Sequence, residues 1–156
     1  MANPFDFSSG AILTAAQLNS IGDWTSYTPT WTELTIGNAT QDFKYAEVNG
    51  IVVVSGRLVW GSTTAITGNI RVTVPVTAAN TQKLANGTDF RFIDASGGLY
   101  YVGGGRALNT TGVYVYSYNA ASTTVKLTSI HDGTAPFANP WTTSDEIIMW
   151  SAYEAA

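Results

Sequence analysis

Residues 42–60, DFKYAEVNGIVVVSGRLVW, consist of two apolar runs on either side of the dipeptide Asn49-Gly50. Every second residue after the dipeptide is apolar or glycine, namely Val52, Val54, Gly56, Leu58 and Trp60. A period of two places such residues on one face of a β-strand. Two-residue hairpin turns favour Asn-Gly because both positions need a positive φ. The stretch therefore predicts a β-hairpin.

The chain after Trp24 continues with short strand-like runs separated by turn-rich pieces. The further runs cover residues 69–74, 89–93, 99–108, 113–118, 123–130 and 146–153. Pieces rich in Gly, Asn, Asp and Ser separate them, with no amphipathic helical pattern in between. Such spacing predicts antiparallel pairing, because parallel strands need crossover helices. We expect an all-β domain over residues 24–156, an antiparallel β-sandwich or jelly roll of about eight strands, with a short N-terminal helix before it.

The segment before this domain, residues 1–23, contains the pattern of that helix. Thr14 is a suitable N-cap, Gln17 completes a capping box, and Gly22 supplies a stop. A helix of about two turns is not stable alone, so its apolar residues need a surface to pack on. We expect an attachment arm that docks through Phe5, Phe7, Leu13, Leu18 and Ile21. A helix that folds back onto its own domain is an equal alternative.

Charge and cysteine content restrict the classes of function. Of the 156 residues, 45% are hydrophobic and 12% charged, and the net charge is -4. This chain should fold, because disordered segments combine low hydrophobicity with high charge. The seven Lys and Arg residues form no basic cluster, which argues against nucleic acid as a partner. No cysteine can form a disulfide, and no apolar run is long enough for a membrane span, so we expect a soluble product without membrane insertion.

No group of residues predicts catalysis. His131 is the single histidine, and the Asp132-Gly133 pair after it is typical of a turn. No nucleophile motif accompanies it, and no spacing among the acidic residues selects two carboxylates for glycan hydrolysis. Asp145-Glu146 could contribute to a calcium site, but the spacing of a calcium-binding loop is absent. We expect a non-enzymatic protein with no catalytic residues, no metal and no cofactor.

Aromatic residues near a glycine-rich stretch suggest binding. No Lys-Ser/Thr pair follows Gly103-Gly104-Gly105, so we interpret these glycines as a strand that lets another backbone or a large ring approach closely. Exposed rings near such glycines could stack on sugars. The candidate glycan contacts are Tyr100, Tyr101 and Trp141, with Tyr114 and Tyr116 as further candidates. Aromatic residues of this kind more often belong to a core or a subunit interface.

Two of the predicted strands carry bulky side chains on both faces. In residues 113–118, VYVYSY, valines alternate with Tyr114, Tyr116 and Tyr118. In residues 146–153, Trp150 lies on the opposite face from Met149. A central place in the sheet or a subunit interface would account for either strand. We predict an interface between copies of the chain at Tyr114, Tyr116, Tyr118 and Trp150.

Three stretches of the first half of the chain form a recognisable pattern: ILTAAQLN at residues 12–19, WTSYTPTW at 24–31, and IGNAT at 36–40 continuing through Phe43, Tyr45 and Gly50 to Gly56. Together they resemble small virion proteins of tailed bacteriophages, of the minor tail, tail-fibre, head-fibre or capsid decoration type. The resemblance implies N-terminal attachment to the virion and an outward β-rich domain, often trimeric. Heptads and Gly-X-Y runs are absent, which favours a compact module over a long fibre.

The principal expectation is therefore a structural component of a phage virion, assembled in the host cytoplasm. Its partners would be other copies in a homotrimer and other virion proteins, with a host-surface glycan as a further candidate for adhesion. One alternative is a carbohydrate-binding module without a virion role. Another is a glycan-cleaving enzyme, which would need two facing carboxylates in a groove.

Overall fold

The computed structural model describes residues 12, 14–15, 21–121, 124–130, 136 and 140–156. The predicted hairpin is present: β3 (Thr40–Val48) and β4 (Ile51–Val59) pair antiparallel over their whole length. Asn49 and Gly50 connect them with φ values of 50° and 75°. Two successive positive φ angles are the signature of the type I′ turn, whose twist matches that of the strands it joins. The Asn-Gly pair therefore sets the register of this hairpin.

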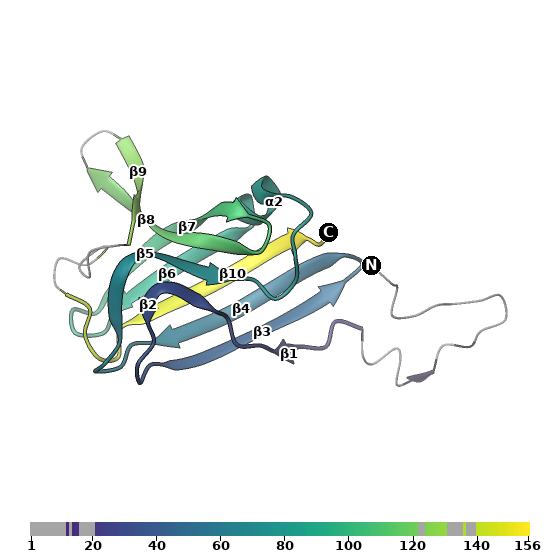
Figure 1. Ribbon diagram of the computed structural model, residues 1–156, viewed down its shortest axis with the longest axis horizontal. Coiled ribbons are helices and arrows are strands. Elements are labelled where there is room, and N and C mark those ends of the chain that lie inside the picture. The colour runs from purple at the N-terminus through teal and green to yellow at the C-terminus, as the bar shows by residue number, and fades with distance from the viewer. Residues whose placement is uncertain (1–11, 13, 16–20, 122–123, 131–135, 137–139) are drawn as a thin grey trace.

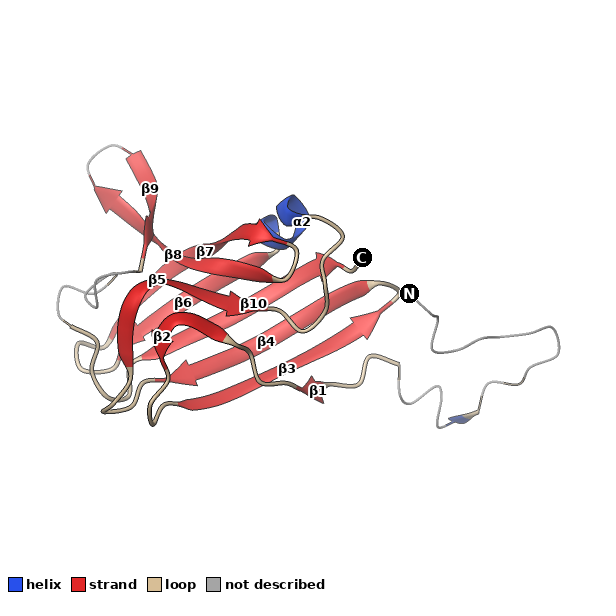
Figure 2. Ribbon diagram, viewed as in Figure 1, coloured by secondary structure: helices blue, strands red, loops and turns tan. Residues whose placement is uncertain are grey.

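The described chain is built almost wholly of antiparallel strands (Figure 2). The other elements are β1 (Thr25–Ser26), β2 (Trp31–Thr35), β5 (Ala65–Thr73), α2 (Thr81–Asn86), β6 (Thr88–Asp94), β7 (Leu99–Asn109), β8 (Gly112–Ala121), β9 (Thr124–Ser129) and β10 (Glu146–Glu154). The strand order is β1-β3-β4-β10-β6-β7-β8-β5-β2, and β9 pairs with β8 beyond the point where β5 ends. The all-β antiparallel prediction is confirmed.

The sheet curls until its two ends approach each other, so β2, β5 and β8 lie over β3, β4 and β10 (Figure 1). The indole N–H of Trp31 on β2 donates to the side-chain oxygen of Gln41 on β3 at 2.7 Å. The rings of Trp31 and Phe43 meet edge to face with centroids 6.0 Å apart. The result is a sandwich-like fold with one core between the two layers. Among the helices formed by the described residues, none is long and apolar enough to cross a bilayer.

Strand β10 lies in the middle of the sheet and pairs with β4 on one side and β6 on the other. Its inward residues Ile147 and Met149 are fully buried. The opposite face carries Ile148 and Trp150. A central position accounts for the buried face of this strand, whereas Trp150 on the outward face is 50% exposed.

The glycine-rich part of β7 makes the close contacts expected of it. A Cβ at Gly103 would lie 1.9 Å from the carbonyl oxygen of Tyr116 on β8 and 2.8 Å from the ring of Phe92 on β6. A Cβ at Gly105 would lie 2.8 Å from Cβ of Thr88. A backbone and a ring thus approach β7, as we interpreted from the sequence, because the curl of the sheet brings β6 and β8 in at this point.

Three elements of the structure were not predicted from the sequence: β1, β2 and α2. Helix α2 is a short helix of six residues between β5 and β6, capped by the side chain of Asn80, which accepts from the backbone N–H of Lys83 at 2.9 Å. The predicted N-terminal helix and four attachment residues, Phe5, Phe7, Leu13 and Leu18, lie outside the described residues, as does His131. Ile21 is described and is exposed.

Candidate binding face

Alternation along the strands gives the sheet a buried inner face and a second, outward face. On β8, Val113 and Val115 are buried while Tyr114 and Tyr116 point outward. The outward surface continues around the curl of the sheet, from β4 through β10, β6, β7 and β8 to β5, and carries arginines and aromatic or apolar side chains. We call this surface the arginine–tyrosine face; it consists of Arg57, Arg71, Arg91, Tyr100, Val102, Arg106, Tyr114, Tyr116, Tyr118, Ile148 and Trp150. All four arginines of the chain lie on it.

The strand registers arrange these side chains in rows across the sheet. In one row, Arg57 pairs with Ile148, Ile148 with Arg91, and Arg91 with Val102. Side chains at paired positions of an antiparallel sheet lie about 5 Å apart at Cβ. Each apolar residue of this row therefore lies beside an arginine, whose aliphatic stem can cover it.

A second row runs from Trp150 through Asp89 and Gly104 to Tyr116. The indole of Trp150 is 50% exposed, a large apolar area for a residue at the centre of a sheet. Tyr116 is half-buried and meets Tyr114 edge to face with ring centroids 6.5 Å apart. Arg106 donates to the hydroxyl of Tyr116 at 3.5 Å. Glycine at position 104 leaves room between the indole and this tyrosine pair.

The charges of the face are only partly compensated. Arg57 forms a two-pronged ion pair with Glu146, in which the Nε donor lies 2.7 Å from the carboxylate. This hydrogen-bonded carboxylate raises the pKa of Arg57. Arg71, Arg91 and Arg106 form no ion pair with another described residue. The four arginines lie on the outward surface of four different strands, with Ile148 between Arg57 and Arg91 and Tyr114 between Arg71 and Arg106. Asp42 and Asp89 lie on the same surface.

The predicted interface residues share this face, and the predicted glycan contacts do not. Tyr118 is 44% exposed, and Trp150 lies in the same row as Tyr116. Tyr100 is 76% exposed and lies on the face, but Tyr101 packs against the core from the other side of β7. Tyr100 and Tyr101 therefore do not form one sugar-binding surface.

The predicted glycan contact Trp141 is a buried residue. Its ring is buried against Trp60, with centroids 4.6 Å apart, and meets Phe92 edge to face. Burial and contacts with two other aromatic rings are typical of a core residue and leave little of the ring exposed for a sugar. Its energetic role is core packing.

The acidic residues considered for calcium have other partners. Asp145 is buried and accepts from the backbone N–H groups of Ala95 at 2.9 Å and Thr142 at 2.6 Å. The Glu146 carboxylate is turned toward Arg57. Within the described ranges, no three His, Cys, Asp or Glu side chains are grouped closely enough to hold a metal ion. Asp145 thus stabilises the turn before β10.

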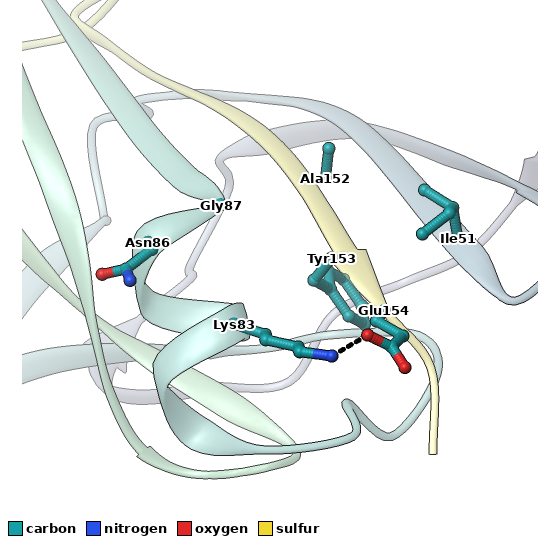
Figure 3. Close-up of a pocket in the computed structure, with 7 residues that line it drawn as sticks. All are labelled: Ile51, Lys83, Asn86, Gly87, Ala152, Tyr153 and Glu154. Atoms are coloured by element: carbon teal, nitrogen blue, oxygen red, sulfur yellow. Dashed lines mark hydrogen bonds and ion pairs between the residues drawn. The ribbon is translucent and has the colours of Figure 1, made fainter.

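One hollow of about 390 Å³ lies between α2 and the end of β10 (Figure 3). The ammonium of Lys83 and the carboxylate of Glu154 form an ion pair across it. Tyr153 donates its hydroxyl proton to the carbonyl of Val76 at 2.8 Å, and burial raises the pKa of this phenol. The ionic groups around this hollow satisfy each other, so it offers a ligand little unpaired polarity.

A second hollow, of about 360 Å³, lies at the β2–β5–β8 end of the arginine–tyrosine face. It is lined by Thr32, Glu33, Gly68, Asn69, Arg71 and Tyr114. The sequence gives no signal for this group, because Glu33 interrupts the alternation of β2 and the residues come from three strands far apart in the chain. Only the pairing of β2 with β5 and of β5 with β8 brings them together.

Comparisons with protein-family models, with curated proteins and with solved structures found no match to this chain.

Proposed function

We propose that the chain is a non-enzymatic surface module of a tailed-bacteriophage virion, an appendage or decoration protein whose β domain works by binding. The observation that carries the proposal is the arginine–tyrosine face, which presents a half-exposed Trp150 and also Arg71, Arg91 and Arg106, three arginines without an ion-pair partner among the described residues. Trp, Tyr and Arg are the residues in which the binding energy of protein interfaces concentrates. A stable sheet that presents them on its outward surface is suited to holding a partner.

Copies of the module associate through this face, and the expected assembly is a homotrimer. Trp150 and Ile148 lie two residues apart on the outward side of β10, and Arg91 lies between Ile148 and Val102, where its aliphatic stem can extend the apolar surface. A single buried aromatic side chain removes roughly 150–250 Å² from water. Burial at about 25 cal/mol per Å² would make this residue the largest contribution to the contact.

The test of assembly is the mass in solution, measured by light scattering on the full chain, on a chain that starts at Trp24, and on two tryptophan variants. Trp150 and Trp24 are both 50% exposed, so Trp24→Gln is a matched control for Trp150→Gln. We expect a trimer for the full chain, for the shortened chain and for Trp24→Gln, and a monomer for Trp150→Gln. A monomeric full chain, or an unchanged mass for Trp150→Gln, would contradict assembly through this face.

Attachment to the virion is the task we assign to residues 1–23, through the apolar residues Phe5, Phe7, Leu13, Leu18 and Ile21. Particles assembled with the full chain should contain the module, and particles assembled with the shortened chain should lack it. Quantitative mass spectrometry of purified virions measures both amounts. Absence of the full chain from particles would refute the virion role, whereas retention of the shortened chain would refute only the attachment by the arm.

A further inference from the structure

The second hollow differs from the rest of the arginine–tyrosine face because opposite charges line it without pairing. Register places Thr32, Arg71 and Tyr114 side by side on β2, β5 and β8. On the opposite side of the same strands, Ile70, Val72 and Val113 are fully buried. The backbone beneath the hollow is therefore held by the core, and the three side chains keep fixed spacings.

Glu33 reaches the hollow through an irregularity in β2. The register shifts between Thr32 and Leu34, and Glu33 has a φ of 59°. A left-handed backbone at a residue other than glycine costs about 1–2 kcal/mol, and bulges that carry such strain often aim a side chain at a functional site. The carboxylate lies over Gly68, where a Cβ would be 2.6 Å from Oε2. The bulge turns the Glu33 side chain toward the hollow, and the absence of a side chain at Gly68 leaves space for its carboxylate.

Arg71 supplies the opposite charge and is likewise fixed. Its Nε is buried without a hydrogen-bond partner among the described residues, close to the backbone at Gly112, where a Cβ would lie 3.4 Å away. Although Arg71 and Glu33 line the same hollow, they form no ion pair in the described part of the chain. The buried Nε does not reach the hollow, but the guanidinium and the Glu33 carboxylate both line it, and the carboxylate accepts a long hydrogen bond from Thr67 at 3.4 Å. A donor and an acceptor group therefore border the same space.

We propose that this hollow binds the terminal neutral hexopyranose of a glycan. Sugar hydroxyls both donate and accept, so one can donate to Glu33 while another accepts from Arg71 or the amide of Asn69. The ring of Tyr114 offers a surface for the apolar C–H face of the sugar. The opposite charges of Glu33 and Arg71 border one cavity and largely cancel, so neither an anion nor a cation gains the net attraction that a site of one sign would give it. About 360 Å³ is at the lower end of ligand pockets, which suits one or two sugar rings.

The inference deepens the proposed function by giving the outward module a ligand class. The test is saturation-transfer NMR and titration calorimetry on the purified full chain. The probes are the methyl glycosides of glucose, galactose, mannose and N-acetylglucosamine, with sialic acid as the anionic comparison. We expect at least one neutral glycoside to bind and sialic acid not to bind. The proposal is refuted if none of the neutral glycosides gives a binding signal, or if sialic acid alone binds.

Variants then locate the site. Glu33→Gln and Arg71→Gln should each weaken binding about tenfold or more, the effect of losing a hydrogen bond to a charged group. Arg91→Gln is the matched control, since Arg91 lies on the same face but does not line the hollow. Tyr100→Ala tests the most exposed tyrosine of the face. If sugar binding is weakened by Tyr100→Ala or Arg91→Gln but not by Glu33→Gln and Arg71→Gln, the proposed site is refuted.

The sugar site and the virion role fail in different experiments. If the module is trimeric and present on particles but binds no neutral glycoside, the site is refuted and the virion role is not. If a glycoside binds with the expected variant pattern while the chain is absent from particles, the site holds and the virion role is refuted. Unfolding midpoints of Glu33→Gln and Arg71→Gln within a few degrees of wild type show that any lost binding is local.

Discussion

Replacement of Gly103 by alanine should destabilise the fold strongly, although it adds a single methyl group. The new Cβ would lie 1.9 Å from the carbonyl oxygen of Tyr116, and approaches below 3.0 Å are essentially never found. Strand β8 would have to move by about 1.1 Å, the difference between these two distances. A backbone oxygen cannot rotate away as a side chain can. We expect a cost near the upper end for overpacking, about 3 kcal/mol.

Urea unfolding followed by tryptophan fluorescence measures the change. For a domain of this size, about 3 kcal/mol corresponds to a fall in Tm of roughly 6–12 °C. Val102→Ala is the control, because its side chain is on the same strand but 56% exposed, and should cost about 1 kcal/mol or less. A Gly103→Ala variant within about 0.5 kcal/mol of wild type, at an unchanged m value, would refute the close approach of β7 and β8.

Three further substitutions test other parts of the structure. The backbone N–H of Gly97 donates to Asp94 and lowers the pKa of this carboxyl group. The ionised carboxylate therefore stabilises the fold above its unfolded pKa, and this stability is lost as the pH falls through the lower folded pKa. Asp94→Asn should reduce the fall in unfolding free energy between about pH 5 and 2, measured by unfolding curves at each pH. Removal of the exposed ion pair between Arg57 and Glu146 by Arg57→Gln should cost less than about 1 kcal/mol, and less again in high salt; a larger, salt-independent loss would contradict a surface ion pair. Trp141→Ala should lower the free energy of unfolding, measured by calorimetry, by about 3–5 kcal/mol, because the ring belongs to the core. A variant that kept its stability but lost sugar binding would instead identify Trp141 as a binding residue.

The sequence predicted those strands whose alternation is regular and whose turns have a distinct chemistry. Asn49-Gly50 and the period-two pattern after it determine the β3–β4 hairpin without help from the rest of the chain. The alternation of residues 113–118 likewise predicted which side chains of β8 face inward. Local steric preference and burial point in the same direction in these strands, so the pattern is sufficient.

The missed elements are those in which tertiary contacts replace a local pattern. Strand β2 is interrupted by the bulge at Glu33 and is held by pairing with β5 and by the hydrogen bond from Trp31 to Gln41. Strand β1 has two residues. Helix α2 is a six-residue helix, too short for a period of 3.6 to emerge from the sequence, although Asn80 followed by Lys83 in the first turn marks its start.

The candidate site could be predicted only in part, because alternation gives the face of a residue within its own strand and nothing about its neighbours. The outward direction of Tyr114 and Tyr116 follows from the valines between them. The arrival of Arg71 beside Tyr114 depends on the β5–β8 register, which no local signal encodes. The burial of Trp141 was not predicted for the same reason: an aromatic residue in a turn-rich segment gives no indication of whether the core will receive it.

The central position of β10 has a consequence for biosynthesis. Strand β10, Glu146–Glu154, is the last of the described strands to be translated, and it pairs with β4 on one side and β6 on the other. The edges of β4 and β6 that pair with β10 therefore stay uncovered until β10 has been made. Until then the nascent chain carries two open strand edges, which invite pairing with other chains. Many of the contacts that close the sheet join residues far apart in sequence, a topology that folds slowly. Ribosome-bound chains that stop before residue 146 should therefore be bound by chaperones. Chains in which β10 has emerged from the ribosome should no longer be bound.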